Sequence, residues 1–132
     1  MSARKLPDNM AYNIRDYKQE DYNGLMELWQ ATGLSAPNRG DNEQVINRTL
    51  RMGGRMLIME STDGEIIGTS WLTNDGRRLY LHHFGIKPAY QGKGLANNLL
   101  HNSLEVAKAT GLQIKLEVHQ NNKKAAKLYK KF

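Results

Sequence analysis

A short glycine-containing stretch, residues 83–100, constrains this chain more than any other part of its sequence. An apolar and aromatic run ends at Ile86, as in a β-strand, and Pro88 then prevents a strand from continuing. Gly92 and Gly94 permit backbone conformations that a Cβ would exclude. After this loop, leucines recur at the spacing of one helix face. The stretch therefore predicts a strand, a turn, a glycine-rich loop and a helix, in that order.

A glycine loop that leads into a helix N-terminus is suited to bind an anion. The first N–H groups of a helix have no partner within the helix, and the helix dipole makes that end positive. Lys87 and Lys93 place two further positive charges beside this loop. Pyrophosphate is therefore the expected ligand. An ordinary tight turn is the alternative interpretation of the two glycines.

The two best-known phosphate-binding loops do not match this sequence. A P-loop needs an earlier glycine and a hydroxyl residue directly after the lysine, but Gly94 follows Lys93 here. A dinucleotide-binding fingerprint needs a third glycine or alanine, and Asn97 occupies that position. Another class of anion-binding loop is therefore expected.

A different pattern matches residue by residue. Gln91, Gly94 and Ala96 fit the Gln/Arg-x-x-Gly-x-Gly/Ala signature of the GNAT superfamily of N-acetyltransferases. Residues 122–129 resemble the Asn-x-x-Ala-x-x-Leu-Tyr segment of the same family, and a predicted helix and strand separate the two motifs, as in the family. The resemblance extends over about residues 12–132, with the strongest motifs in the C-terminal part.

The resemblance implies an α/β (α+β) GNAT fold. Such a fold has a mixed, mostly antiparallel sheet with a central parallel pair that splays at the cofactor site, and helices flank the sheet. One acetyltransferase domain is expected over residues 11–132, after a flexible tail over residues 1–10. Because family members continue with further strands, the C-terminal strands are expected to be missing. A homodimer that completes the sheet is a hypothesis.

The hydrophobic pattern and the turn residues predict individual elements that agree with this fold. Short glycine-containing turns predict antiparallel pairing of three central strands, and the helix after the loop predicts a parallel strand beyond it. The expected strands cover residues 12–15, 56–60, 65–72, 78–86 and 112–118, and the expected helices cover about residues 22–32, 45–52 and 95–110, with a last helix from residue 121.

The resemblance also implies where acetyl-CoA, the expected co-substrate, would bind. It would lie in the opening between the strand ending at Ile86 and the strand ending near Val118. Backbone groups of Phe84 and Ile86, on either side of Gly85, would hold the pantetheine arm as an added strand would. Asn122 would lie near the pantetheine, although a helix N-cap is the alternative role. The pyrophosphate would bind the loop and the first helical residues, which are Gln91, Gly92, Lys93, Gly94, Leu95 and Ala96.

The expected reaction is direct attack of a primary amine on acetyl-CoA in a ternary complex. Tyr129 matches the family tyrosine that protonates the leaving thiolate as a general acid, and a core aromatic is its alternative role. The general base stays open between Glu117, His82, His83 and no side chain at all. The acceptor is a small-molecule amine, a peptide N-terminus or a lysine side chain.

Composition excludes several other classes of site. The sequence has no cysteine, and its four histidines show no metal-ligand spacing, so no metal site is expected. No apolar run is long enough to cross a membrane, and the N-terminus does not resemble a secretory signal, so a cytoplasmic location is expected.

A net charge of +6 has three interpretations. The excess lies in five lysines among the last ten residues, which form a solvated helix face, a positive field beside bound phosphates or a nucleic-acid patch. No aromatic residues interleave with the basic ones, so no nucleic-acid partner is expected. A non-catalytic acyl-CoA-binding module on the same fold remains the alternative function, and a basic nucleic-acid-binding protein is a third.

Overall fold

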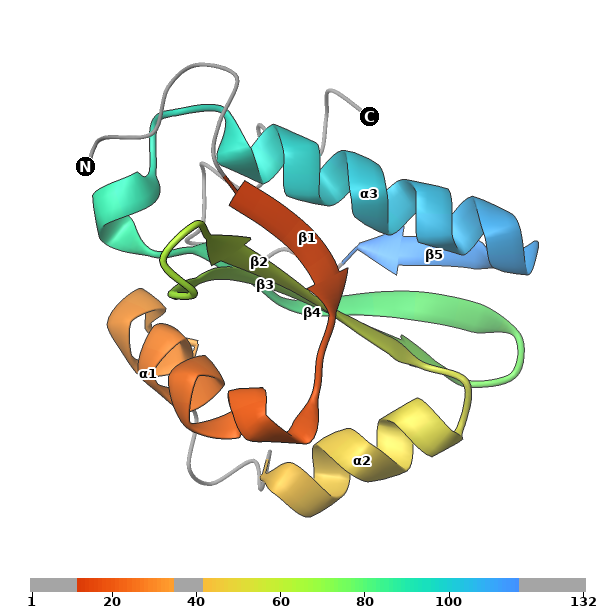
Figure 1. The fold of residues 1–132 in the computed structure, drawn as a ribbon. Coiled ribbons are helices and arrows are strands. Elements are labelled where there is room, and N and C mark those ends of the chain that lie inside the picture. The colour runs from red at the N-terminus through yellow and green to blue at the C-terminus, as the bar shows by residue number, and fades with distance from the viewer. Residues whose placement is uncertain (1–11, 35–41, 117–132) are drawn as a thin grey trace.

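The computed structural model of the chain describes residues 12–34 and 42–116. Five strands form one sheet in chain order, with α1 and α2 on one face and α3 on the other (Figure 1). The fold is therefore the mixed α/β arrangement predicted from the sequence. The elements in chain order are β1 (Tyr12–Asp16), η1 (Gln19–Asp21), α1 (Tyr22–Thr32), α2 (Glu43–Arg51), β2 (Arg55–Ser61), β3 (Ile66–Asn74), β4 (Arg78–Ile86), η3 (Pro88–Tyr90), α3 (Leu95–Thr110) and β5 (Gln113–Leu116).

The first four strands pair antiparallel, and β2, β3 and β4 form the meander that their turn residues predict. The β2–β3 hairpin turns at Gly64, whose φ of +86° is a conformation that favours glycine. Between β3 and β4, the N–H of Gly76 donates to Asn74 Oδ1 at 2.7 Å and closes the second turn. These local signals place three long strands side by side in the middle of the sheet.

α3 returns the chain to the sheet and makes the one parallel pair among the described strands. β5 pairs with β4 from Arg78↔Gln113 to Leu81↔Leu116. α3 ends at Gly111, whose φ is +77°, as the sequence predicts for a C-terminal glycine. The predicted splaying of this pair, the remainder of the strand after Leu116, the last helix and the N-terminal tail lie outside the described residues.

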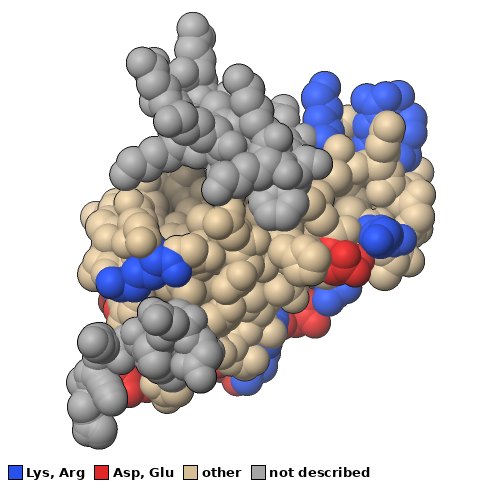
Figure 2. Space-filling view, turned by 90° about the horizontal axis from the view of Figure 1, so that it is seen from above, with Lys and Arg blue, Asp and Glu red and all other residues tan. Residues whose placement is uncertain are grey.

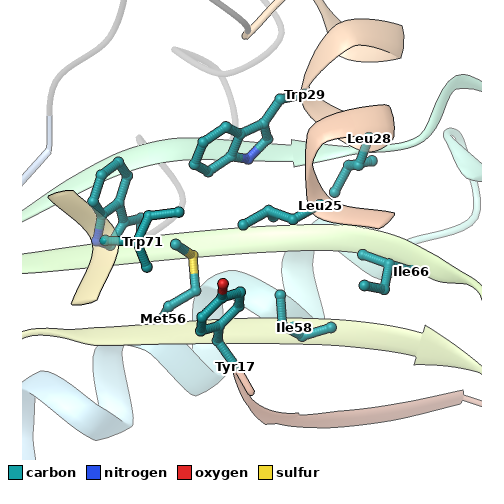
Figure 3. Packing of buried hydrophobic residues seen from close by; sticks show 9 residues of the cluster. Tyr17, Leu25, Leu28, Trp29, Met56, Ile58, Ile66 and Trp71 are labelled. Carbon is teal, nitrogen blue, oxygen red and sulfur yellow. The ribbon is translucent and has the colours of Figure 1, made fainter. Parts of the chain in front are cut away.

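Strand alternation divides the core into two layers, one on each face of the sheet. Met56 and Ile58 of β2 face α1 and α2, whereas Leu57 and Met59 face α3. Figure 3 shows the α1–α2 side, which contains two tryptophans. The buried cluster on that side consists of Tyr17, Leu25, Leu28, Trp29, Ile46, Met56, Ile58, Ile66 and Trp71.

Two polar contacts, one in the core and one at a helix end, do not follow from the hydrophobic pattern. Ser103 lies on the buried face of α3, and its hydroxyl lies 2.6 Å from the hydroxyl of Ser70 in β3. Asn42 caps α2, because its Oδ1 accepts from the N–H of Val45 at 3.0 Å, so α2 begins at Glu43 rather than at Val45.

None of the helices in the described ranges is both long and apolar enough to cross a bilayer.

Candidate functional site

A β-bulge interrupts β4 at its two histidines. Thr69 pairs with Gly85, but Trp71 pairs with His82, so β4 has one more residue than β3 between these pairs. His83 lies in this extra space with a φ of +46°, a left-handed conformation that is costly for a residue with a Cβ. The bulge lies directly before Phe84, Gly85 and Ile86, the residues predicted to hold the pantetheine arm.

The bulge also turns two consecutive side chains toward the same face of the sheet. Successive residues of a regular strand point to opposite faces. Here His82 Nε2 lies 2.8 Å from Thr73 Oγ1, and the ring of His83 lies 4.2 Å from that of Trp29 on α1. Both histidines therefore face the α1–α2 side, where Trp71 contacts each of them.

Packing against the tryptophans holds the bulge in place. The rings of Trp29 and Trp71 are stacked with centroids 5.6 Å apart, and His83 lies 5.2 Å from Trp71. Trp71 Nε1 also donates to Thr49 Oγ1 of α2 at 3.0 Å. Contacts with two helices thus offset the strain at His83 and fix the position of the neighbouring candidate base, His82.

The residues after the bulge continue β4 toward the glycine loop. Phe84 and Ile86 pack toward α3, and Ile86 is buried. A Cβ added to Gly85 would lie 3.1 Å from Leu34 Cδ1, close to the end of α1. Gly85 thus has a packing reason to be glycine, and its predicted role in binding the cofactor remains a prediction.

The backbone groups of Ile86 point toward the β5 side of β4. Lys87 N–H donates to Ile67 O at 2.7 Å, and antiparallel pairs alternate, so the groups of Ile86 point away from β3. On that side Gln91 Nε2 donates to Ile86 O at 2.8 Å, while Gln91 N–H donates to Pro88 O. Gln91 therefore braces the entry to the loop, and its predicted contact with pyrophosphate is not tested.

The loop and the first turn of α3 present a row of N–H groups, from residues 92–97, that donate to no described residue. The first helical bond of α3 is that of Asn98 N–H to Gly94 O at 3.4 Å. Gly94 occupies the N-cap with a φ of +80°, and no side chain caps the helix. An added Cβ at Gly92 or Gly94 would meet nothing within 4 Å, so positive φ alone accounts for both glycines. These N–H groups fit an anionic ligand such as pyrophosphate.

Only one of the two lysines beside the loop offers a free charge. Lys87 carries the positive charge expected beside the loop, but its Nζ lies 2.7 Å from Glu65 Oε2, so this charge is paired. The pKa of Glu65 lies below its ordinary value, chiefly because Lys87 donates to it. Lys93 is exposed and forms no ion pair within the described ranges. Figure 2, viewed from the α3 side, shows Lys and Arg in separate groups rather than in a continuous stripe.

Three predicted site residues, Glu117, Asn122 and Tyr129, lie outside the described residues, and their roles stay predictions. The structure brings together His82, Phe84, Gly85, Ile86 and the glycine loop along one strand and its exit. His83, which the sequence left as one of several bases, forms the bulge. Within residues 12–34 and 42–116, no three His, Asp or Glu side chains are grouped as metal ligands.

Comparisons with known proteins agree with this architecture. An acetyltransferase of Pectobacterium atrosepticum is 29% identical over 119 residues, which cover 89% of this chain and 84% of that protein. A GNAT acetyltransferase from Staphylococcus aureus has the same fold, with a TM-score of 0.81 at 19% identity over 92% of this chain and 82% of that one. The PaiA N-acetyltransferase of Thermoplasma acidophilum, solved in complex with coenzyme A, has a TM-score of 0.72 at 21% identity. This match covers 92% of this chain and 88% of that one. The model of the acetyltransferase (GNAT) family matches residues 18–132, and the chain therefore belongs to that family.

Proposed function

We propose that the chain is an N-acetyltransferase that transfers an acetyl group from acetyl-CoA to a primary amine by direct attack in a ternary complex. The main observation behind this proposal is the row of N–H groups from residues 92–97. These groups lie in the loop and the first turn of α3, and they have no acceptor among the described residues. Membership of the GNAT family and the fold shared with a coenzyme A complex support it.

The glycine loop would hold the pyrophosphate of the co-substrate through backbone groups. Gly92, Gly94 and Ala96 contribute N–H groups that point to no other acceptor in the described chain, and Lys93 adds an exposed charge. The N–H of Ile86 lies on the β5 side of β4, where a pantetheine arm would pair as a strand does. Acetyl-CoA supplies the activated acyl group when it is bound.

In the proposed mechanism, residues at and after the bulge would supply proton transfer and charge stabilisation beside that arm. His82 would act as the general base, because an imidazole can accept a proton from an ammonium acceptor near neutral pH. A backbone N–H near Ile86 would stabilise the oxyanion. Tyr129 would donate the proton to the departing thiolate, and Glu117 is the other candidate base.

The test is a panel of amines assayed by release of free thiol from acetyl-CoA. The proposal expects turnover with at least one class among small amines, peptide N-termini and lysine side chains. Tyr129→Phe should bind acetyl-CoA as the wild type does but turn over about a hundredfold more slowly, the usual scale of general-acid catalysis. Full activity of that variant would remove the role of Tyr129.

Binding without turnover for every amine in the panel would favour the non-catalytic acyl-CoA-binding module. In that case Tyr129→Phe would have no functional effect. Salt-sensitive binding of DNA, without acetyl-CoA binding, would instead favour a nucleic-acid-binding protein.

A further inference from the structure

We infer that Glu65, at the start of β3, is a positioning residue for the glycine loop. Its carboxylate holds Lys87 and Tyr90, which flank the turn from which the loop emerges. The inference rests on the proposed function, because the loop is the site assigned to the pyrophosphate of acetyl-CoA.

Glu65 is itself fixed by the β2–β3 hairpin. Its carbonyl accepts from the N–H of Ser61 at 2.9 Å, and its own N–H donates to Ser61 Oγ at 3.2 Å. The N–H of Gly64 donates to Ser61 O at 2.9 Å and closes the turn. The carboxylate therefore projects from a tightly bonded turn rather than from a mobile loop.

Each oxygen of the Glu65 carboxylate holds one end of the η3 turn. Lys87 Nζ lies 2.7 Å from Oε2, and Tyr90 OH donates to Oε1 at 3.0 Å. Lys87 and Tyr90 are also joined to each other, because Tyr90 N–H donates to Lys87 O at 2.8 Å. The pKa of Tyr90 lies above its ordinary value because of burial and of this carboxylate. The three residues form a closed set of contacts, which we call the Glu65 clamp.

The clamp ends where the glycine loop begins. Gln91 follows Tyr90 directly and is bonded through its side chain to Ile86 O at 2.8 Å. The next residues include Gly92 and Gly94, which have no side chains to hold them in place. N–H groups bind pyrophosphate well only when the groups are oriented before binding. Fixing the entry to the loop therefore lowers the entropy lost when the ligand binds.

The clamp hypothesis and a direct phosphate contact by Lys87 predict opposite results for one substitution. If Lys87 acts through its charge, Glu65→Gln frees that charge and tightens the binding of acetyl-CoA. If Lys87 acts through the clamp, Glu65→Gln loosens the turn and weakens binding. Because both side chains are partly exposed, the expected loss is moderate, about fivefold in Kd.

The experiment is a double-mutant cycle on the full chain, with the Kd of acetyl-CoA measured by calorimetry. We expect Glu65→Gln, Lys87→Met and the double variant each to raise the Kd about fivefold, without additivity. The KM for acetyl-CoA should rise by the same factor, and kcat should stay unchanged. A general loss of stability would not raise KM alone.

Glu60→Gln is the matched control, because Glu60 lies on β2 and pairs with Arg15 instead. It should leave the Kd for acetyl-CoA unchanged. Tyr90→Phe keeps the ring and removes only the hydroxyl that contacts Glu65, so it tests the clamp even if Glu65→Gln fails to fold; the expected rise in Kd is about twofold.

If Glu65→Gln and Tyr90→Phe both bind acetyl-CoA with the Kd of the wild type, the inference is overturned. The proposed function would not be affected by that result. Tighter binding by Glu65→Gln, together with weaker binding by Lys87→Met, would also overturn it. Failure of the folded wild type to bind acetyl-CoA would overturn the proposed function and the inference with it.

Discussion

At the scale of single residues, His83 and Gly94 both adopt a left-handed backbone, but for different reasons. His83 has a φ of +46° and is held there by the rings of Trp29 and Trp71. Gly94 has a φ of +80°, and an added Cβ would meet nothing within 4 Å. Because a Cβ at Gly94 would disturb only the local backbone and no packed neighbour, Gly94 is a sharper probe of the loop than His83 is.

We predict that Gly94→Ala weakens acetyl-CoA binding by about tenfold. A side chain in the left-handed region costs about 1 kcal/mol, and relieving that strain would rotate the N–H groups that face the pyrophosphate. Calorimetric titration of the variant measures the change in Kd.

Gly76→Ala is the control for Gly94→Ala. Gly76 has a φ of +89°, and its added Cβ would also meet nothing within 4 Å, but it lies in the β3–β4 turn. Both variants should lose similar stability, yet only Gly94→Ala should lose affinity. Equal affinities for acetyl-CoA in both variants would mean that the loop does not bind it.

We predict that His82→Gln lowers kcat by about a hundredfold and leaves the Kd for acetyl-CoA unchanged. If His82 is the base, the wild-type rate falls as decreasing pH protonates the imidazole, and this limb disappears in the variant. A pH–rate profile of kcat measures both effects. His101→Gln, on the exposed side of α3, is the matched control. An unchanged kcat for His82→Gln would leave Glu117, His83 or no side chain as the base.

At the scale of elements, a charge network ties β1 to β2 and to η1. Arg15 donates to both oxygens of Asp21 at 2.8 Å and to Glu60 Oε1 at 2.8 Å. Lys18 N–H adds a bond to Asp21 at 2.7 Å. The side chain of Asp21 is only 7% exposed, so its charge depends on these partners.

We predict that Asp21→Asn lowers the free energy of unfolding by about 2 kcal/mol at pH 7. Hydrogen bonds from Arg15 hold the pKa values of Asp21 and Glu60 below their ordinary values. Depressed carboxylate pKa values add stability above the unfolded pKa, and this stability is lost as pH falls through the folded pKa. The wild type should therefore lose stability below about pH 4, and Asp21→Asn should show less of this loss. Urea unfolding at several pH values measures both.

Asp16→Asn supplies the comparison for Asp21→Asn on the same part of the chain. Asp16 pairs with Arg55, but its side chain is 63% exposed, so the substitution should change stability by less than about 0.5 kcal/mol. If the two variants lost the same stability, the buried network would not stabilise the junction of β1, β2 and η1.

The sequence predicts those elements whose signals are local. Gly64 and Gly76 mark the two hairpin turns, Gly111 marks the end of α3, and the leucines of α3 mark its buried face, and the structure confirms each of these. The bulge at His83 could not be predicted, because one extra residue in a strand leaves no local pattern. It depends on the register against β3 and on the packing of Trp29 from α1.

Contacts between distant residues account for the other differences between prediction and structure. Lys87 lies in the predicted loop entry, but its partner Glu65 is 22 residues away, in another hairpin. The sequence shows that a lysine lies beside the predicted phosphate-binding loop, but only the fold shows that its charge is paired with Glu65. The contact of buried Ser103 is also invisible in the sequence, because its partner Ser70 lies on another element.

At the scale of the whole molecule, the sheet divides the proposed site between its two faces. α3 and the glycine loop begin where β4 ends, whereas the histidines of the bulge face α1 and α2 on the other side (Figure 1). β4 thus joins a region suited to an anionic co-substrate to a region with proton-accepting side chains. The roles of Glu117, Asn122 and Tyr129 remain predictions, because these residues lie outside the described ranges.

The most direct test of this account is a calorimetric titration of acetyl-CoA into the full chain, with folding checked by circular dichroism. The account predicts saturable binding at one site per chain, and competition by free coenzyme A, because both carry the pyrophosphate that the N–H row of α3 would bind. A folded sample that releases or absorbs no heat of binding at any temperature tested, and gains no thermal stability from acetyl-CoA, would contradict the account.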